Sequence, residues 1–151
     1  MNIWAPLPNN TNTLYVVKVA GGVSGNPVTW SPDPGTRVKI YMGSFTVTTP
    51  PIGVVRQPQW RLLYGSDVVG VGTAAVSLGA NTTYRITMGK FYRWSWGVTD
   101  RAIQVYWDSD IYLTSDFTLE IGGTVIEGLD MYADLVLYLD CWNDMTMRVS
   151  G

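Results

Sequence analysis

Two runs, Arg37-Val-Lys-Ile-Tyr-Met42 and Thr83-Tyr-Arg-Ile-Thr-Met88, decide the fold class of this chain. In the first run apolar residues alternate with charged or aromatic ones: Val38, Ile40 and Met42 against Arg37, Lys39 and Tyr41. The second run sets Tyr84, Ile86 and Met88 against Arg85 and Thr87. Because neighbouring side chains of a β-strand point to opposite faces, each run predicts a strand with one face in the core and one in water.

Similar segments follow outward from these runs, separated by Gly, Pro, Asn and Asp. They are Leu14–Val19, Ser44–Thr48, Trp60–Tyr64, Val68–Val71, Ala74–Leu78, Phe91–Trp96, Ala102–Trp107, Phe117–Ile121, Leu135–Asp140 and Met145–Val149. The connections are too short for crossover helices, so the strands should pair mainly antiparallel. The sequence therefore predicts an all-β fold: an antiparallel β-sandwich or jelly-roll-like barrel of about 8–12 short strands with an extended N-terminal arm.

One segment fits both an α-helix and a β-strand. In Leu129–Trp142, the spacing of Met131, Leu135, Leu139 and Trp142 approaches that of a helix, whereas Leu135, Leu137 and Leu139 also alternate as in a strand. The β-rich surroundings favour a strand.

A length of 151 residues predicts one domain, spanning 14–151, after an arm formed by residues 1–13. The arm is rich in Pro and Asn and carries three large apolar side chains, Ile3, Trp4 and Leu7. They predict that the arm docks, either on its own domain or on a neighbouring subunit.

The composition argues against an enzyme. The chain has no His, which removes the usual general base and the commonest zinc ligand, and its single Cys141 has no partner for a disulfide. Glu120 and Glu127 are the only glutamates, and no pattern around them indicates a glycosidase pair. We expect no catalytic residue and no cofactor.

Charge is distributed unevenly along the chain. Residues 1–104 hold nine basic and three acidic residues, a net charge of +6, whereas residues 105–151 hold one basic and nine acidic residues, a net charge of −8. If strands from the two parts interleave, the charges mix; if they separate, the molecule has a basic and an acidic pole suited to head-to-tail contacts. The sequence leaves both arrangements open.

Neither nucleic acid nor a membrane is an expected partner. The isoelectric point is acidic and no dense Lys/Arg cluster occurs, which argues against binding to phosphate backbones. No stretch approaches 18 uninterrupted apolar residues, and the N-terminus does not resemble a secretory signal.

Aromatic residues are abundant, with 7 Trp and 9 Tyr. Trp94 and Trp96 share a strand face with Tyr92 and could either fill the core or contact a ligand. Trp30, within the turn-rich segment Gly21–Gly35, is expected outside the strands and is a candidate contact residue together with Trp4.

Asp108, Asp110 and Asp116 form the densest acidic group and are weak candidates for a calcium site. The group lacks the glycine and distal glutamate of a helical calcium loop, so a solvated turn is the simpler interpretation and no metal is expected. Asp140 and Asp144, which flank Cys141 and Trp142, are likewise interpreted as a charged turn.

The arm of residues 2–12, the short Thr/Val/Tyr/Gly strands and the missing catalytic set together resemble the small all-β structural proteins of bacteriophage virions, such as capsid decoration or cement proteins. This resemblance implies a non-enzymatic homo-oligomer that stabilises a particle through contacts with viral capsid or other virion proteins. It also implies localisation to the virion, and to the host cytoplasm during assembly. The aromatic content leaves a second hypothesis open, a carbohydrate-binding or receptor-binding β-sandwich module.

Overall fold

The computed structural model describes residues 15–19, 22–51, 55–90, 102–107, 110–126 and 128–143. These residues contain ten strands and no helix: β1 (Tyr15–Val19), β2 (Val28–Trp30), β3 (Thr36–Thr48), β4 (Pro58–Tyr64), β5 (Asp67–Thr73), β6 (Thr83–Gly89), β7 (Ala102–Tyr106), β8 (Ile111–Thr114), β9 (Phe117–Gly123) and β10 (Met131–Asn143). The predicted arm of residues 1–13 lies outside the described residues.

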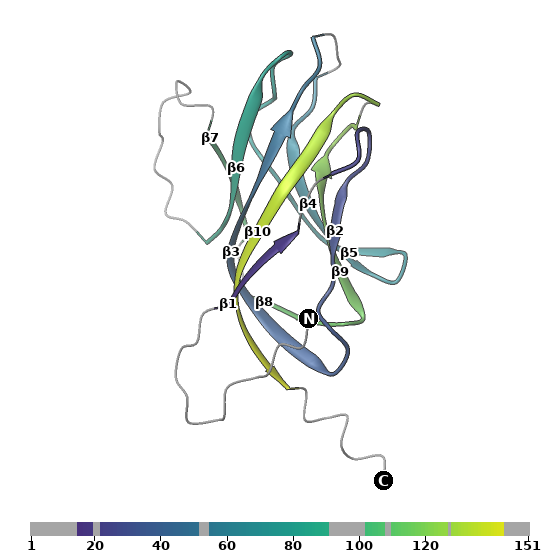
Figure 1. Ribbon diagram of the computed structural model, residues 1–151, viewed down its shortest axis with the longest axis vertical. Helices are drawn as coiled ribbons and strands as arrows, with labels where there is room; N and C mark the ends of the chain where they lie inside the picture. The colour runs from purple at the N-terminus through teal and green to yellow at the C-terminus, as the bar shows by residue number, and fades with distance from the viewer. Residues whose placement is uncertain are drawn as a thin grey trace.

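The strands form two sheets that pack face to face as a β-sandwich (Figure 1). A six-stranded sheet has the order β1-β10-β3-β6-β7, with β8 also paired to β3, and a four-stranded sheet has the order β2-β9-β4-β5. The pairings are antiparallel except for β6 with β7, which is parallel. The predicted all-β, mainly antiparallel fold is therefore confirmed.

The core lies between the sheets and draws alternate residues from both. Leu137 and Ile86 of the larger sheet and Leu119 and Ile121 of the smaller one are completely buried in a single apolar cluster. Trp60 of β4 meets Trp107, which follows β7, edge to face with ring centroids 5.8 Å apart. The alternation predicted for β6 and β9 is confirmed: Ile86, Met88, Leu119 and Ile121 are buried, and Tyr84 and Phe117 are partly buried against the core.

The two longest strands differ from the prediction. Arg37–Met42 and Ser44–Thr48 were expected as separate strands, but they form one 13-residue strand, β3. Met42 pairs with Tyr138 and Ile40 with Leu139, which leaves Tyr41 as the extra residue of a β-bulge. Beyond the bulge the buried positions change from even to odd numbers, so the break in alternation resembled the end of a strand. Met42, expected in the core, is consequently only half-buried.

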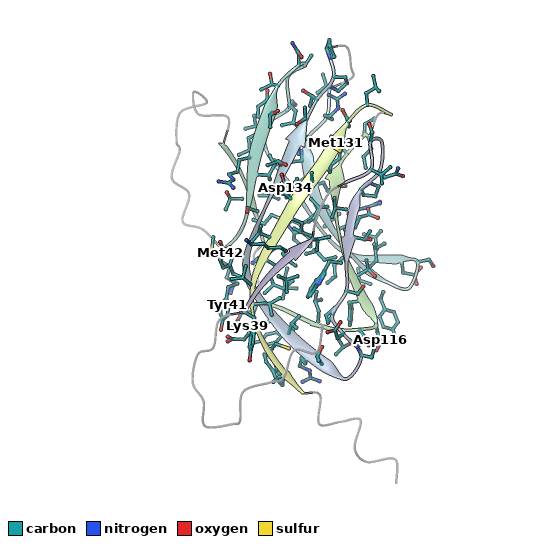
Figure 2. The ribbon with its side chains drawn as sticks, viewed as in Figure 1. Lys39, Tyr41, Met42, Asp116, Met131 and Asp134 are labelled. Carbon is teal, nitrogen blue, oxygen red and sulfur yellow. The ribbon has the colours of Figure 1, made fainter. Side chains whose placement is uncertain are left out.

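A second bulge bends the partner strand β10. Ala133 pairs with Thr46 and Val136 with Ser44, so Asp134 and Leu135 together face Phe45. Asp134 has a φ of 54°, and its carboxylate accepts a hydrogen bond from the Thr46 hydroxyl at 3.2 Å. Figure 2 shows Asp134 on β10 below Met131, where the strand begins.

Other expectations are corrected locally. Leu129–Trp142 is a strand from Met131 onward, as favoured, and Asp140 lies within it rather than in a turn. Ala74–Leu78 is not a strand, because only Leu78 forms an isolated bridge, to Arg56. Two short strands, β2 and β8, were not predicted.

A fully buried ion pair joins the loop before β4 to the residue before β10. Arg56 Nε lies 2.9 Å from Asp130 Oδ2, with the two side chains 1% and 0% exposed. The neighbouring Tyr132 hydroxyl is buried without a hydrogen-bond partner among the described residues. Burial, followed by the negative charge of Asp130, raises the pKa of Tyr132 to about 12.

The two differently charged parts of the chain interleave. β10 lies between β1 and β3, and β9 lies between β2 and β4. Four ion pairs in the described residues each join a basic residue of the first part to an acidic residue of the second: Lys39–Asp110, Arg56–Asp130, Arg61–Glu120 and Lys90–Asp110. In the described part of the chain the charges therefore mix instead of forming two poles.

Candidate functional site

The edge strand β5 is the most exposed apolar element among the described residues. It ends the four-stranded sheet and, within the described part of the chain, pairs with β4 alone; in Figure 1 the β4–β5 hairpin projects to the right of the other strands. Val68, Val69 and Val71 are 50%, 55% and 52% exposed. β5 carries one charge, Asp67 at its first position, and neither Lys nor Pro. Natural sheet edges are usually protected by charged residues or Pro. Because β5 has almost none of these, it is an accessible apolar edge.

Glycines determine which side of β5 faces inward. A Cβ at Gly72 would lie 2.2 Å from Trp60 Nε1, and one at Gly70 would lie 3.5 Å from the Trp60 ring. The Trp60 indole therefore lies directly against the inner surface of β5. Val71, on the opposite face, pairs with Arg61, whose Nε donates to Glu120 Oε1 at 2.6 Å.

The hydrogen-bond register shows which backbone groups of β5 point away from the sheet. Ala74 N donates to Pro58 O at 2.8 Å, so the backbone of Ala74 faces β4. Backbone groups alternate in direction along a strand, which directs the N–H and C=O of Thr73 and Val71 outward. The register shift at Val69 lies nearer the hairpin and leaves Gly70–Thr73 regular. These four residues form a short sheet edge that can accept another strand.

A second surface lies on the outer face of the larger sheet, where β10, β3 and β8 run side by side. We call Tyr41, Tyr112 and Trp142, with Lys39 between them, the aromatic face. Lys39 Nζ lies 5.1 Å from the Tyr41 ring centroid and 5.6 Å from that of Tyr112, within the range of cation–π contacts. The Tyr112 and Trp142 rings meet edge to face at 6.2 Å.

Charged groups hold the aromatic face in place. The Tyr41 hydroxyl donates to Asp140 Oδ2, and this hydrogen bond, followed by burial, raises the pKa of Tyr41. Asp110 accepts from Lys90 Nζ at 2.8 Å and lies 3.3 Å from Lys39 Nζ, and hydrogen bonds from these two lysines lower the pKa of Asp110. Desolvation opposes the charged form of Lys39, but the Asp110 hydrogen bond and charge leave its pKa raised. The result is a pre-ordered surface with exposed rings: Tyr41 is 41% and Tyr112 51% exposed.

The weak calcium candidates do not gather in the described part of the structure. Asp110 belongs to the lysine pairs of the aromatic face, whereas Asp116 lies in the turn before β9 and accepts a hydrogen bond from the Thr114 hydroxyl at 3.5 Å. Figure 2 places Asp116 on the opposite side of the view from Lys39, the partner of Asp110. Asp108 is outside the described residues. Across the described ranges, no three His, Cys, Asp or Glu side chains are grouped for a metal ion.

The predicted contact residues fall mostly in undescribed segments. Ile3, Trp4 and Leu7 of the arm, and Trp94 and Trp96, are not among the described residues. Trp30 is described; it ends β2, opposite Leu119, and its partly buried ring packs against the core. The expectation that Trp30 lies outside the strands was wrong, because a three-residue strand is too short to show alternation.

Cys141 of β10 lies in the core. It is free and 1% exposed, and burial raises the pKa of its thiol. Among the described residues, no helix is long and apolar enough to cross a membrane.

Sequence reasoning missed both surfaces. It predicted a strand at Val68–Val71 but could not place it at an edge, since edge position depends on strand order. The Val-Gly-Val-Gly pattern of residues 69–72 was a usable signal, because it has no polar face to meet water. Tyr41 was predicted on a solvent face, but its grouping with Tyr112 and Trp142 arises from pairing between distant strands.

Compared with protein-family models, curated proteins and solved structures, the chain matches none.

Proposed function

We propose that this protein is a non-enzymatic structural component of a virion, a bacteriophage capsid or capsid-decoration protein that stabilises the particle through subunit contacts. The observation that carries the proposal is the exposed apolar edge of β5, with three valines each about half exposed. Protein monomers usually protect such an edge, whereas an assembling subunit uses it. The resemblance of the sequence to small all-β virion proteins gives the assembly its context.

The proposed partners are viral capsid or other virion proteins and further copies of the chain, with the virion as its location after assembly in the host cytoplasm. Head-to-tail contacts between a basic and an acidic pole are not part of this proposal, because the charges interleave in the described part of the chain. The arm residues Ile3, Trp4 and Leu7 remain proposed interface anchors.

The experiment is a density-gradient separation of the native source, with the protein quantified by mass spectrometry in each fraction. We expect it in a particle fraction at a fixed ratio to the other particle proteins. A variant lacking residues 1–12 should remain folded but leave that fraction. Recovery of the full chain only among free proteins at the top of the gradient would contradict the proposal.

The aromatic face supports a second candidate function, a carbohydrate- or receptor-binding module. Exposed rings stack on the apolar faces of sugars, and the neighbouring carboxylates and lysines can bind hydroxyl groups. Tyr112→Ala should then abolish binding on a glycan array, whereas Tyr64→Ala, an equally exposed tyrosine on the other sheet, should not. If the unaltered protein bound none of the glycans on the array, these glycans would be excluded as its ligands.

A further inference from the structure

We propose that two copies of the chain pair through β5, antiparallel and about a two-fold axis beside Gly72, so that the two four-stranded sheets become one continuous sheet. This inference rests on the proposed structural function and names the partner of the β5 edge as a second copy.

Backbone direction selects the register. The outward groups of β5 belong to Val71 and Thr73, because Ala74 donates to Pro58 of β4. An antiparallel copy centred on Gly72 places Val71 opposite Thr73 of the second copy, and Thr73 opposite its Val71. Each pair can exchange two backbone hydrogen bonds, and the irregular position at Val69 stays outside the paired segment.

Charge selects the orientation and the kind of partner. The only charge of β5 is Asp67, at its hairpin end. A parallel pair would bring the two Asp67 carboxylates together, whereas an antiparallel pair places them at opposite ends. The segment Gly70–Thr73 has no charge for a charged partner to complement, so an uncharged, β-branched strand is the matching surface. A second copy of β5 is such a strand.

Side-chain shape allows the approach on both faces. On the inner face the axis passes beside Gly72, whose missing Cβ leaves room for the Trp60 ring of each copy. On the outer face Val71 and Thr73 of the second copy form a β-branched cross-strand pair. Because the two-fold arrangement uses the same edge on both copies, it closes at a dimer and leaves β5 unavailable for further growth.

Sedimentation velocity over a concentration series, with the full chain, tests the pairing. We expect a reversible dimer, and Val71→Lys should raise its dissociation constant at least tenfold, about 1.4 kcal/mol. Val125→Lys is the matched control, since Val125 is similarly exposed, at 43%, but lies outside β5. Both variants should retain the far-ultraviolet circular dichroism of the unaltered protein.

Disulfide trapping tests the register. Opposite residues of a hydrogen-bonded antiparallel pair have Cα atoms about 5.5 Å apart, a separation that a disulfide spans. Under mild oxidation the double variant Val71→Cys/Thr73→Cys should form a covalent dimer, whereas the unaltered protein, with only the buried Cys141, should not.

A protein that stays monomeric at every concentration, or a dimer that withstands Val71→Lys, would overturn the pairing. Either outcome is separate from the proposed function, because recovery in the particle fraction is measured independently and would persist if another surface made the contacts. If the protein formed the dimer but was absent from the particle fraction, the proposed virion role would be overturned instead.

Discussion

Tyr132 is a buried phenol whose hydroxyl contributes little to the core. The hydroxyl has no hydrogen-bond partner among the described residues, and an unsatisfied buried polar group costs about 1–3 kcal/mol. We therefore expect Tyr132→Phe to leave the free energy of unfolding at pH 7 unchanged or to raise it by about 1 kcal/mol. Urea unfolding measures the difference, and a loss of more than about 1 kcal/mol would show that the hydroxyl has a stabilising partner.

The same residue predicts a response to alkaline pH. A tyrosine in the unfolded chain loses its proton near pH 10, whereas folded Tyr132 has a pKa of about 12. Between these values the folded state binds more protons, so its stability is complete below pH 10 and falls as the pH rises toward 12. In Tyr132→Phe this part of the alkaline decline should be absent.

The Tyr132 hydroxyl leaves no room for a side chain at residue 123, which is a glycine. A Cβ at Gly123 would lie 2.4 Å from the Tyr132 hydroxyl oxygen and 3.0 Å from the Val125 carbonyl oxygen. Gly123→Ala should therefore destabilise the fold by about 1–3 kcal/mol. Adding Tyr132→Phe removes the closest atom and should recover part of this loss, which a double-mutant cycle of urea unfolding would measure. Strictly additive effects would contradict the proposed clash.

At the scale of elements, the β10 bulge depends on Asp134 holding a left-handed conformation. Its φ of 54° is unfavourable for most residues, and its carboxylate offsets this by accepting from Thr46. Asp134→Gly should change the free energy of unfolding by less than about 1 kcal/mol, whereas Asp134→Val should reduce it by about 1–2 kcal/mol. Thermal unfolding ranks the two variants, and equal melting temperatures would mean that the bulge relaxes without cost.

The same bulges mark the limit of what the sequence could predict. Regular alternation located β6, β9 and most of β10, because a half-buried strand shows its two faces in its side chains. Alternation failed at Tyr41, where one extra residue changes the buried face within β3. It also failed for β2 and β8, which have three and four residues, too few to establish a period. The candidate surfaces were less predictable still, because strand order creates them.

At the scale of the whole molecule, neither sheet can be completed without the last part of the chain. β10 separates β1 from β3, and β9 separates β2 from β4. A chain ending at residue 107 would keep β1 to β7 and lack β8, β9 and β10. We expect it to show no cooperative thermal transition, as followed by circular dichroism, whereas the full chain unfolds in one step. A cooperative transition in the shortened chain would mean that β1 to β7 form an independent unit.

The strand order also affects the protein while it is being made. Ribosomes deliver the N-terminal strands first, at roughly 5–20 residues per second. β5 ends at Thr73 and β10 at Asn143, so the valine-rich hairpin waits for several seconds before both sheets can close. Throughout that interval β5, with its exposed valines, lies beside other nascent chains on the same messenger RNA. The β4–β5 hairpin is therefore open to pairing with such chains until β9 and β10 emerge.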